Sequence, residues 1–213
     1  KSHQQIDVAR LENEVIQACR SWKDDYASLL VETFGEAQGT NVLSEFPDAF
    51  PAGYRERFAA HSAVVDMQHL LSLSAERKLV MSFYQPLAST EQQLHCKLYH
   101  ADSPLALSDV LPILENLGLR VLGEFPYRLR QQNGRELWIH DFAFTYAEGL
   151  DVDIQQLNDT LQDAFVHIVE GEAENDAFNR LVLTAAMPWR DVALLRAYAR
   201  YLKQIRLGFD LSY

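Results

Sequence analysis

Residues Leu117 to Tyr146 read LGLRVLGEFPYRLRQQNGRELWIHDFAFTY, and this stretch decides the fold. The dipeptide Asn133-Gly134 lies between two runs that are rich in aromatic and β-branched residues. An Asn-Gly pair in that position is the strongest short-range indication of a β-hairpin closed by a type I′ turn. The stretch is therefore predicted to be the end of a helix followed by two antiparallel strands.

The predicted turn sets the pairing of the two strands, with Gln132 facing Arg135. The cross-strand pairs on one face are then Leu129 with Trp138, Tyr127 with His140, Phe125 with Phe142, and Val121 with Tyr146. The opposite face carries Arg128, Arg130, Glu124, Asp141 and Thr145. The first face is expected to be core, and the second is expected to be wet or docked.

Two strands and two helices flank the hairpin. In chain order they are predicted at 78–85 and 93–101 for the strands, and at 108–117 and 154–170 for the helices. Ser108 is the predicted N-cap of the first helix and Gly118 the residue that closes it. Pro112 is tolerable only if it lies near the first turn of that helix.

The order strand, helix, hairpin, helix makes most of a ferredoxin-like unit, in which a helix crosses back over an antiparallel sheet. The fold class is therefore α+β. The predicted sheet order is 79–85, 93–101, 135–146, 120–131. Both helices are expected to cover the face that carries Trp138 and Phe142.

Helical segments are predicted at both ends of the chain. Apolar positions recur at helical spacing from Asp7 to Phe34, and Gly35 follows where a C-cap is expected. A loop with at most one short turn is predicted from Gly35 to Gly53, because of its glycines and prolines. The remaining predicted helices are 54–61, 62–73, 176–186 and 189–206. The chain thus divides into a helical segment 1–75, an α+β domain 76–172 and a helical appendage 173–213.

The first helix has two interpretations. Val8, Val15, Trp22 and Leu29 fit a heptad, which would make the helix an oligomerisation arm. The simpler interpretation is that it packs on its own domain. The acidic run 148–176 and the basic last helix are likewise expected to be solvated faces, with attraction to one another or to a neighbouring domain as the alternative.

Composition excludes several classes of partner. The net charge of -11, from 30 acidic and 19 basic residues, argues against nucleic acid or an anionic membrane. No apolar run approaches the roughly 20 residues that would span a bilayer. Cys19 and Cys96 stand without a CxxC pattern, which fits a reducing compartment. We expect a piece of a longer cytoplasmic protein, since neither an initiator Met nor a signal peptide opens the chain.

The histidines on the predicted strands do not form a catalytic group. His140 and Asp141 are adjacent on a strand, so their side chains point to opposite faces. His140 is expected to be a core histidine. His95 and His100 are five positions apart, also on opposite faces, and both are expected at the surface.

Other patterns also fail to predict a catalytic, cofactor or metal site. Asp66 and His69 are three apart on a predicted helix and are expected to be a surface pair rather than the start of a metal site. The glycines never form a GxGxxG motif, so the sequence predicts no phosphate-binding loop for a dinucleotide. The aromatic strand residues lack the basic-aromatic pattern of an RNA-binding sheet.

The turn after the second predicted strand resembles part of a known family. Asp102-Ser103-Pro104 matches the turn that follows the first strand of ACT domains, which are amino-acid-sensing regulatory domains. The resemblance implies an ACT-like fold and makes Asp102, Ser103 and Pro104 the candidate effector turn. Leu105 stands where ligand-binding members have Gly, and its side chain is expected to obstruct an effector.

A second resemblance covers more of the chain. Residues 117–142 and WRDVALLRAYARYLKQ, residues 189–204, resemble the non-catalytic region of the large bacterial NAD-dependent glutamate dehydrogenases. The resemblance implies a third ACT-like domain and a helical appendage that precede the catalytic domains. It also implies that NAD binds elsewhere in the parent enzyme, and that the partners of this piece are other domains and subunits of that enzyme.

Three hypotheses about function follow. The first is an architectural or oligomerisation module, favoured by the long first helix and the obstructed turn. The second is a regulatory domain that binds an amino-acid effector at the turn and the facing sheet edge. The third is a free-standing enzyme, which the lack of a nucleophile-base pair, metal set or phosphate loop disfavours.

Overall fold

The computed structural model describes residues 21–86, 93–102, 105–146 and 154–205. The chain forms two compact units. One unit contains the residues up to Ser72 together with the hairpin tip Arg128–Glu136. The other contains Leu73–Tyr127 and Leu137–Tyr213, and therefore most of the sheet.

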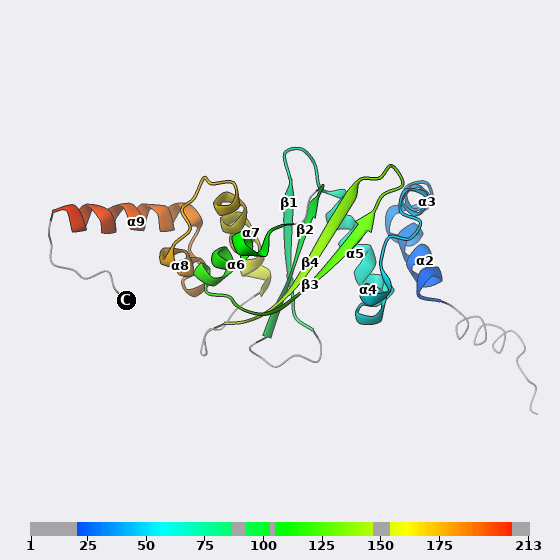
Figure 1. The fold of residues 1–213 in the computed structure, drawn as a ribbon, viewed down its shortest axis with the longest axis horizontal. Coiled ribbons are helices and arrows are strands. Elements are labelled where there is room, and N and C mark those ends of the chain that lie inside the picture. Colours follow the sequence, from blue (N-terminus) through cyan, green and yellow to red (C-terminus); the bar gives the residue numbers. More distant parts are fainter. Residues whose placement is uncertain (1–20, 87–92, 103–104, 147–153, 206–213) are drawn as a thin grey trace, which may run out of the picture. The chain divides into compact units, whose positions relative to one another are not determined.

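The four strands form one sheet in the order β1-β2-β4-β3 (Figure 1). The strands are β1 Leu79–Tyr84, β2 Gln93–Ala101, β3 Arg120–Arg130 and β4 Glu136–Thr145. β2 pairs antiparallel with both β1 and β4, so that Leu98 lies between Met81 and His140. The predicted α+β class and sheet order are confirmed.

Helices α6 Leu107–Asn116 and α7 Ile154–Val169 pack on one face of this sheet. Met81, Leu98 and Phe142 from three strands join Leu114 of α6 and Phe165 of α7 in one hydrophobic cluster. Each of these five side chains is exposed by 1% or less. Burying one large apolar side chain contributes about 1.5–3 kcal/mol, so this cluster holds both helices on the sheet.

The hairpin is closed by a different turn from the predicted one. Gly134 has a φ of 89°, whereas Asn133 is not among the residues with positive φ. The N–H of Gly134 donates to the carbonyl of Gln131 at 2.9 Å, and the N–H of Gln131 donates to the carbonyl of Arg135 at 2.9 Å. These bonds close a three-residue loop that ends in a left-handed glycine. A type I′ turn needs positive φ at both central residues, so the predicted turn type is wrong.

The longer loop shifts the strand register by one residue near the turn. Gln131, rather than the next residue, faces Arg135. Leu129 therefore falls opposite Leu137 and not opposite Trp138. Because side chains alternate along a strand, a shift of one residue places the β3 side chains near the turn on the opposite face from the predicted one, relative to β4.

The exchange corrects several predicted positions in the hairpin. Phe125, predicted to pair with Phe142 in the core, is 45% exposed, whereas Phe142 is 1% exposed. Glu124, predicted on the face opposite His140, contacts His140. Asp141 lies on the face predicted to be wet or docked, and there it is fully buried. Val121 and Tyr146, predicted on the core face, do pack against the cluster, so the exchange does not reach the start of β3.

The N-terminal unit contains α2 Trp22–Phe34, α3 Glu36–Glu45, α4 Ala52–Arg57 and α5 Ala60–Leu71. Ser21 starts α2 with a capping box: its hydroxyl accepts from the N–H of Asp24, whose carboxylate accepts from the N–H of Ser21. Gly35 ends α2, as predicted. The earlier part of the predicted long helix, with Val8 and Val15 of the heptad, lies outside the described residues.

Helix α3 occupies part of the predicted loop, so the prediction of at most one short turn there is wrong. Gly39, taken from the sequence as a loop residue, lies inside α3. A Cβ at Gly39 would be 2.8 Å from the Cα of Val31 on α2. Glycine at this position therefore lets two helix backbones approach closely.

The chain after the sheet forms the short helices η1 Ala177–Asn179 and α8 Arg180–Thr184, then the longer α9 Trp189–Gln204. Arg196 of α9 is 4% exposed and donates to both carboxylate oxygens of Asp176, at 2.7 and 2.9 Å. Arg200 of α9 donates to the carboxylate of Glu174. The acidic run and the basic helix are thus joined by ion pairs, where solvated faces were expected.

Candidate functional site

The candidate effector turn follows β2. Asp102 has a φ of 75°, a left-handed conformation that Asp adopts more readily than most residues. Ser103 and Pro104 lie outside the described residues. Leu105 is partly buried and packs against the hydrophobic cluster of the sheet. The side chain at the position of the family's glycine is therefore drawn toward the core.

The helix after this turn begins earlier than predicted. Ala106 is the N-cap of α6 and provides no side-chain cap, so the predicted capping role of Ser108 is wrong. The hydroxyl of Ser108 instead lies 3.2 Å from the carboxylate of Asp109 within the first turn. Pro112 lies inside the helix, beyond the turn in which proline is tolerated at no cost.

A polar pair, a buried histidine and a partly buried glutamate, lies on the helix-covered face of the sheet. Nδ1 of His140 is 2.6 Å from Oε1 of Glu124, and the His100 ring stacks on the His140 ring at 5.1 Å between centroids. Both histidines are 4% exposed. The prediction of a core His140 is confirmed, and the prediction of a surface His100 is wrong. Glu124 is partly buried and holds the ring of the buried His140 in place.

The opposite face of the sheet carries a second buried polar group. The hydroxyl of Tyr84 donates to Oδ1 of Asp141 at 2.7 Å, and Nδ1 of His95 lies 3.7 Å from the same oxygen. Lys97 pairs with Asp141 across β2 and β4 and is 4% exposed. Buried charges are costly unless they are paired. The sequence signal for this group is a pair of opposite charges, Lys97 and Asp141, in register on neighbouring strands.

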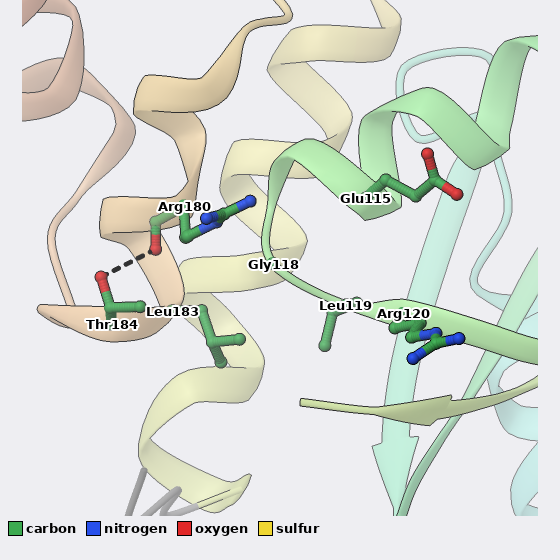
Figure 2. Close-up of a pocket in the computed structure, with 7 residues that line it drawn as sticks. All are labelled: Glu115, Gly118, Leu119, Arg120, Arg180, Leu183 and Thr184. Atoms are coloured by element: carbon green, nitrogen blue, oxygen red, sulfur yellow. Dashed lines mark hydrogen bonds between the residues drawn. The ribbon is translucent and has the colours of Figure 1, made fainter. Parts of the chain in front are cut away.

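A pocket of about 300 Å³ lies where α6 ends and β3 begins (Figure 2). Gly118 makes the turn between them with a φ of 91°. Its N–H donates to the carbonyl of Glu115 at 2.9 Å, and the N–H of Leu119 donates to that of Leu114 at 3.0 Å. This pair of bonds is a Schellman C-cap, and it confirms that Gly118 closes the helix.

Apolar side chains and a close-packed arginine stem form the inner part of the pocket. Leu119 is fully buried and Leu183 is 4% exposed, and Figure 2 shows them on facing sides of the space beside Gly118. A Cβ at Gly118 would lie 3.2 Å from Cγ of Arg180. Glycine here therefore serves both the left-handed turn and the close passage of the Arg180 stem.

Three exposed charged residues complete the pocket lining. They are Glu115, Arg120 and Arg180. Figure 2 shows Arg180 on the α8 side of Gly118, with Glu115 and Arg120 on the other side. Within the described part of the chain, none of the three makes a side-chain hydrogen bond or ion pair. The sequence does not predict this site, because α8 is distant along the chain from α6 and β3 and meets them only in the folded structure.

The predicted metal candidate has another role. Asp66 accepts a hydrogen bond from the hydroxyl of Tyr54 and is 3% exposed, so it is not the exposed helix-surface group that was expected. Among the residues that the structure describes, no three His, Cys, Asp or Glu side chains are grouped to hold a metal ion. No described helix combines the length and the apolar character needed to cross a membrane.

Three family models match the chain in succession. The model described as "Glutamate dehydrogenase, helical motif 2" matches residues 29–73. The model described as "Glutamate dehydrogenase, ACT3 domain" matches residues 78–157, a range that contains the whole sheet. The model described as "Glutamate dehydrogenase, helical motif 3" matches residues 173–213.

Curated relatives point to the same family. The chain is 84% identical over all of its 213 residues to the NAD-specific glutamate dehydrogenase of Pseudomonas aeruginosa. It is 44% identical to that of Halomonas elongata over 98% of the chain, and 27% identical to that of Mycobacterium tuberculosis over 96%. It spans 13% of the length of each of these proteins. The chain belongs to the NAD-specific glutamate dehydrogenase family, as the stretch that carries the ACT3 domain and the helical motifs on both sides of it.

Proposed function

We propose that this chain is the regulatory and architectural part of an NAD-dependent glutamate dehydrogenase. The parent polypeptide oxidatively deaminates L-glutamate to 2-oxoglutarate and ammonia, and NAD accepts the electrons outside this stretch. The observation that carries the proposal is the 84% identity over the whole chain to a protein of which the chain spans only 13%. Burial of His140, which is 4% exposed, also favours a structural role for this residue.

The proposed division of labour follows three segments. Residues 1–75 form a helical segment, residues 76–172 the ACT-like domain, and residues 173–213 an appendage that leads to the catalytic region. The family matches at 29–73, 78–157 and 173–213 support this division. The partners of the segments are other domains and subunits of the parent enzyme, which acts in the cytoplasm.

A second candidate function is binding of an amino-acid effector at the turn Asp102, Ser103 and Pro104. The observation that favours it is the packing of Leu105 against the hydrophobic cluster. A leucine that packs inward obstructs the outer side of the turn less than the sequence alone led us to expect. Glycine remains better suited to a close approach of a ligand to the backbone.

The proposed function is tested by measuring glutamate-dependent reduction of NAD. The 213-residue chain is expected to show no turnover, and the complete polypeptide is expected to show it. Turnover by the 213-residue chain alone would contradict the division of labour. A complete polypeptide that is inactive with glutamate and NAD would contradict the proposed reaction.

A further inference from the structure

We propose that the exposed apolar face of α9 docks into an uncharged, helix-lined groove in the part of the parent polypeptide that lies outside these 213 residues. The α9 face consists of six large apolar side chains, five on the helix and one at its C-cap: Leu194, Leu195, Tyr198, Tyr201, Leu202 and Ile205. The proposal rests on the proposed function, because it assumes a longer parent enzyme, and it names the surface by which the appendage joins the rest of that enzyme.

The opposite side of α9 is already packed on its own domain. Val192 is 1% exposed and belongs to the hydrophobic cluster of the sheet. The guanidinium of Arg196 is buried and binds Asp176, and the Trp189 ring stacks on the His167 ring of α7 at 4.4 Å between centroids. These contacts fix the rotation of the helix about its axis. They also turn the α9 face away from the residues that hold the helix.

The apolar residues are confined to one side of α9. At 3.6 residues per turn, Tyr201 and Leu195 mark the edges of an arc of roughly 120°. After the first turn, the charged residues of the helix, Arg196, Arg200 and Lys203, lie on the opposite side. An apolar strip wider than about 100° is typical of a helix that faces the core of a folded protein, whereas a two-stranded coiled coil uses a narrower one. The α9 face therefore fits a groove rather than a single partner helix.

The chemistry of the α9 face indicates a permanent contact. Tyr198 and Tyr201 are 59% and 58% exposed, and the other members of the face are leucine and isoleucine. Permanent interfaces are more apolar than transient ones, and charged residues are depleted at their centres. A charged groove would lose its hydration against this face without gaining a partner charge. The groove is therefore expected to be uncharged.

The size of the α9 face argues against a second copy of this chain as its occupant. Six side chains that are about half exposed present on the order of 500 Å² of apolar surface, whereas stable complexes of separate proteins bury about 800 Å² on each partner. A tethered partner needs less area, because the tether gives it a high effective concentration. The chain spans 13% of the length of its curated relatives, so a parent of that length supplies tethered surface many times larger than this chain.

The test is photo-crosslinking within the complete polypeptide, with Tyr201 replaced by benzoylphenylalanine. Irradiation is expected to join position 201 to a peptide outside the 213 residues, which mass spectrometry of the digest identifies. The product should keep the mass of one polypeptide on a denaturing gel, because the link is internal. A link to α9 of a second copy, a link within the 213 residues, or no link at all would overturn the proposal.

Lys203 is the matched position for the crosslinking control. It is exposed, lies within one turn of Tyr201, and points to the opposite side of α9. Benzoylphenylalanine at position 203 is expected not to reach the peptide that position 201 reaches. Equal links from both positions would show that the contact is not specific to the α9 face, and would overturn it.

Hydrogen exchange of the last turns of α9 gives a second measurement. In the 213-residue chain residues 200–205 are all exposed, so their amides are expected to exchange rapidly. In the complete polypeptide, docking should slow their exchange by about tenfold or more. Equal exchange in the two chains would overturn the proposal.

Two adjacent substitutions in the complete polypeptide separate the α9 face from the rest of the helix. Leu202→Asp places a charge in the apolar contact and is expected to restore rapid exchange. Lys203→Asp makes a larger change of charge on the opposite side and should keep the slow exchange. Loss of protection in both variants would overturn the assignment to the α9 face, and circular dichroism checks that both variants fold.

The docking and the proposed function can fail separately. Glutamate-dependent reduction of NAD is measured on the same complete polypeptide that carries the crosslinker. An active polypeptide without the link at position 201 would overturn the docking and leave the proposed reaction untouched. An inactive polypeptide that forms the link would contradict the proposed reaction and support the docking.

Discussion

The side-chain oxygen of Asn158 accepts a hydrogen bond from the backbone N–H of Phe83 at 3.2 Å. Gln162, one turn later on α7, accepts from the N–H of Met81 at 3.3 Å. β1 is an edge strand of the sheet. The unpaired N–H groups of an edge strand can pair with a strand of another chain. Two amide side chains of α7 therefore bind the N–H groups through which β1 could pair with a strand of another chain.

Replacing both amides by leucine, in the double variant Asn158→Leu/Gln162→Leu, is expected to promote self-association, because the N–H groups of Phe83 and Met81 lose their acceptors. Light scattering coupled to size-exclusion chromatography over a range of concentrations measures the mass. Asp159→Leu adds an apolar side chain to the same helix without removing either bond, and it should keep the original mass. Equal association of both variants would assign the effect to surface hydrophobicity.

Glu124→Ala is expected to lower the free energy of unfolding by about 1–3 kcal/mol, because it leaves a ring nitrogen of the buried His140 without its partner. Urea denaturation measures the change. In a His140→Phe background the same substitution should cost less, since no polar group is then left unpaired. Equal costs in both backgrounds would show that the Glu124–His140 contact contributes nothing to stability.

Arg196→Met is expected to destabilise the attachment of α9 by about 3 kcal/mol, because it leaves Asp176 and Asn179 without the buried guanidinium that they bind. Arg200→Met places the same residue on the same helix and should change stability little, since the pair of Arg200 with Glu174 is exposed. Helical circular dichroism during urea unfolding compares them. Similar effects of the two would contradict the role of burial.

The exposed pair also has a pH signature. The hydrogen bond from Arg200, followed by its charge, holds the pKa of Glu174 below its usual range. A carboxylate with a lowered pKa contributes stability above its unfolded-state pKa, and the contribution is lost as pH falls through the folded-state value. Any difference between Arg200→Met and the unaltered chain should therefore disappear in acid and diminish at high salt.

Cys96 is expected to resist alkylation in the folded protein. Its side chain is fully buried, and burial raises the pKa of the thiol well above its ordinary value. The thiolate is the form that reacts with alkylating reagents. Burial both keeps the reagent away from the sulfur and disfavours formation of the thiolate. In a Cys19→Ser variant, native chains should react with iodoacetamide only after urea is added. Reaction of native chains at mildly alkaline pH would show that β2 opens.

The sequence predicted those elements that are determined by residues close to one another in the chain. Glycine at position 118 predicted the end of α6, because a left-handed C-cap favours glycine, and the order of strands and helices along the chain predicted the sheet order. Contacts between distant segments were not predictable in this way. Gly39 was interpreted as a loop residue, because the residues next to it in the sequence do not show that α2 and α3 pack closely. The pocket likewise depends on Arg180 and Arg120, which are far apart in the sequence and line it together.

The conformation of the hairpin turn can be tested by replacing Asn133 and Gly134 separately. Gly134 has positive φ, so Gly134→Ala is expected to cost about 1–2 kcal/mol in the free energy of unfolding. Asn133→Ala meets no such strain and loses one hydrogen bond, from the N–H of Arg135 to its side chain at 2.9 Å. Asn133→Asp keeps that acceptor and should be close to neutral.

Gly53→Ala is the control for the general effect of replacing glycine. Gly53 lies inside α4, and a Cβ there would meet nothing within 4 Å. Alanine should therefore stabilise α4 by roughly 0.5–1 kcal/mol, opposite in sign to Gly134→Ala. In a type I′ turn Asn133 would also have positive φ. Glycine at position 133, in Asn133→Gly, would then stabilise the hairpin, whereas in the observed loop it removes the Asx hydrogen bond and should destabilise it.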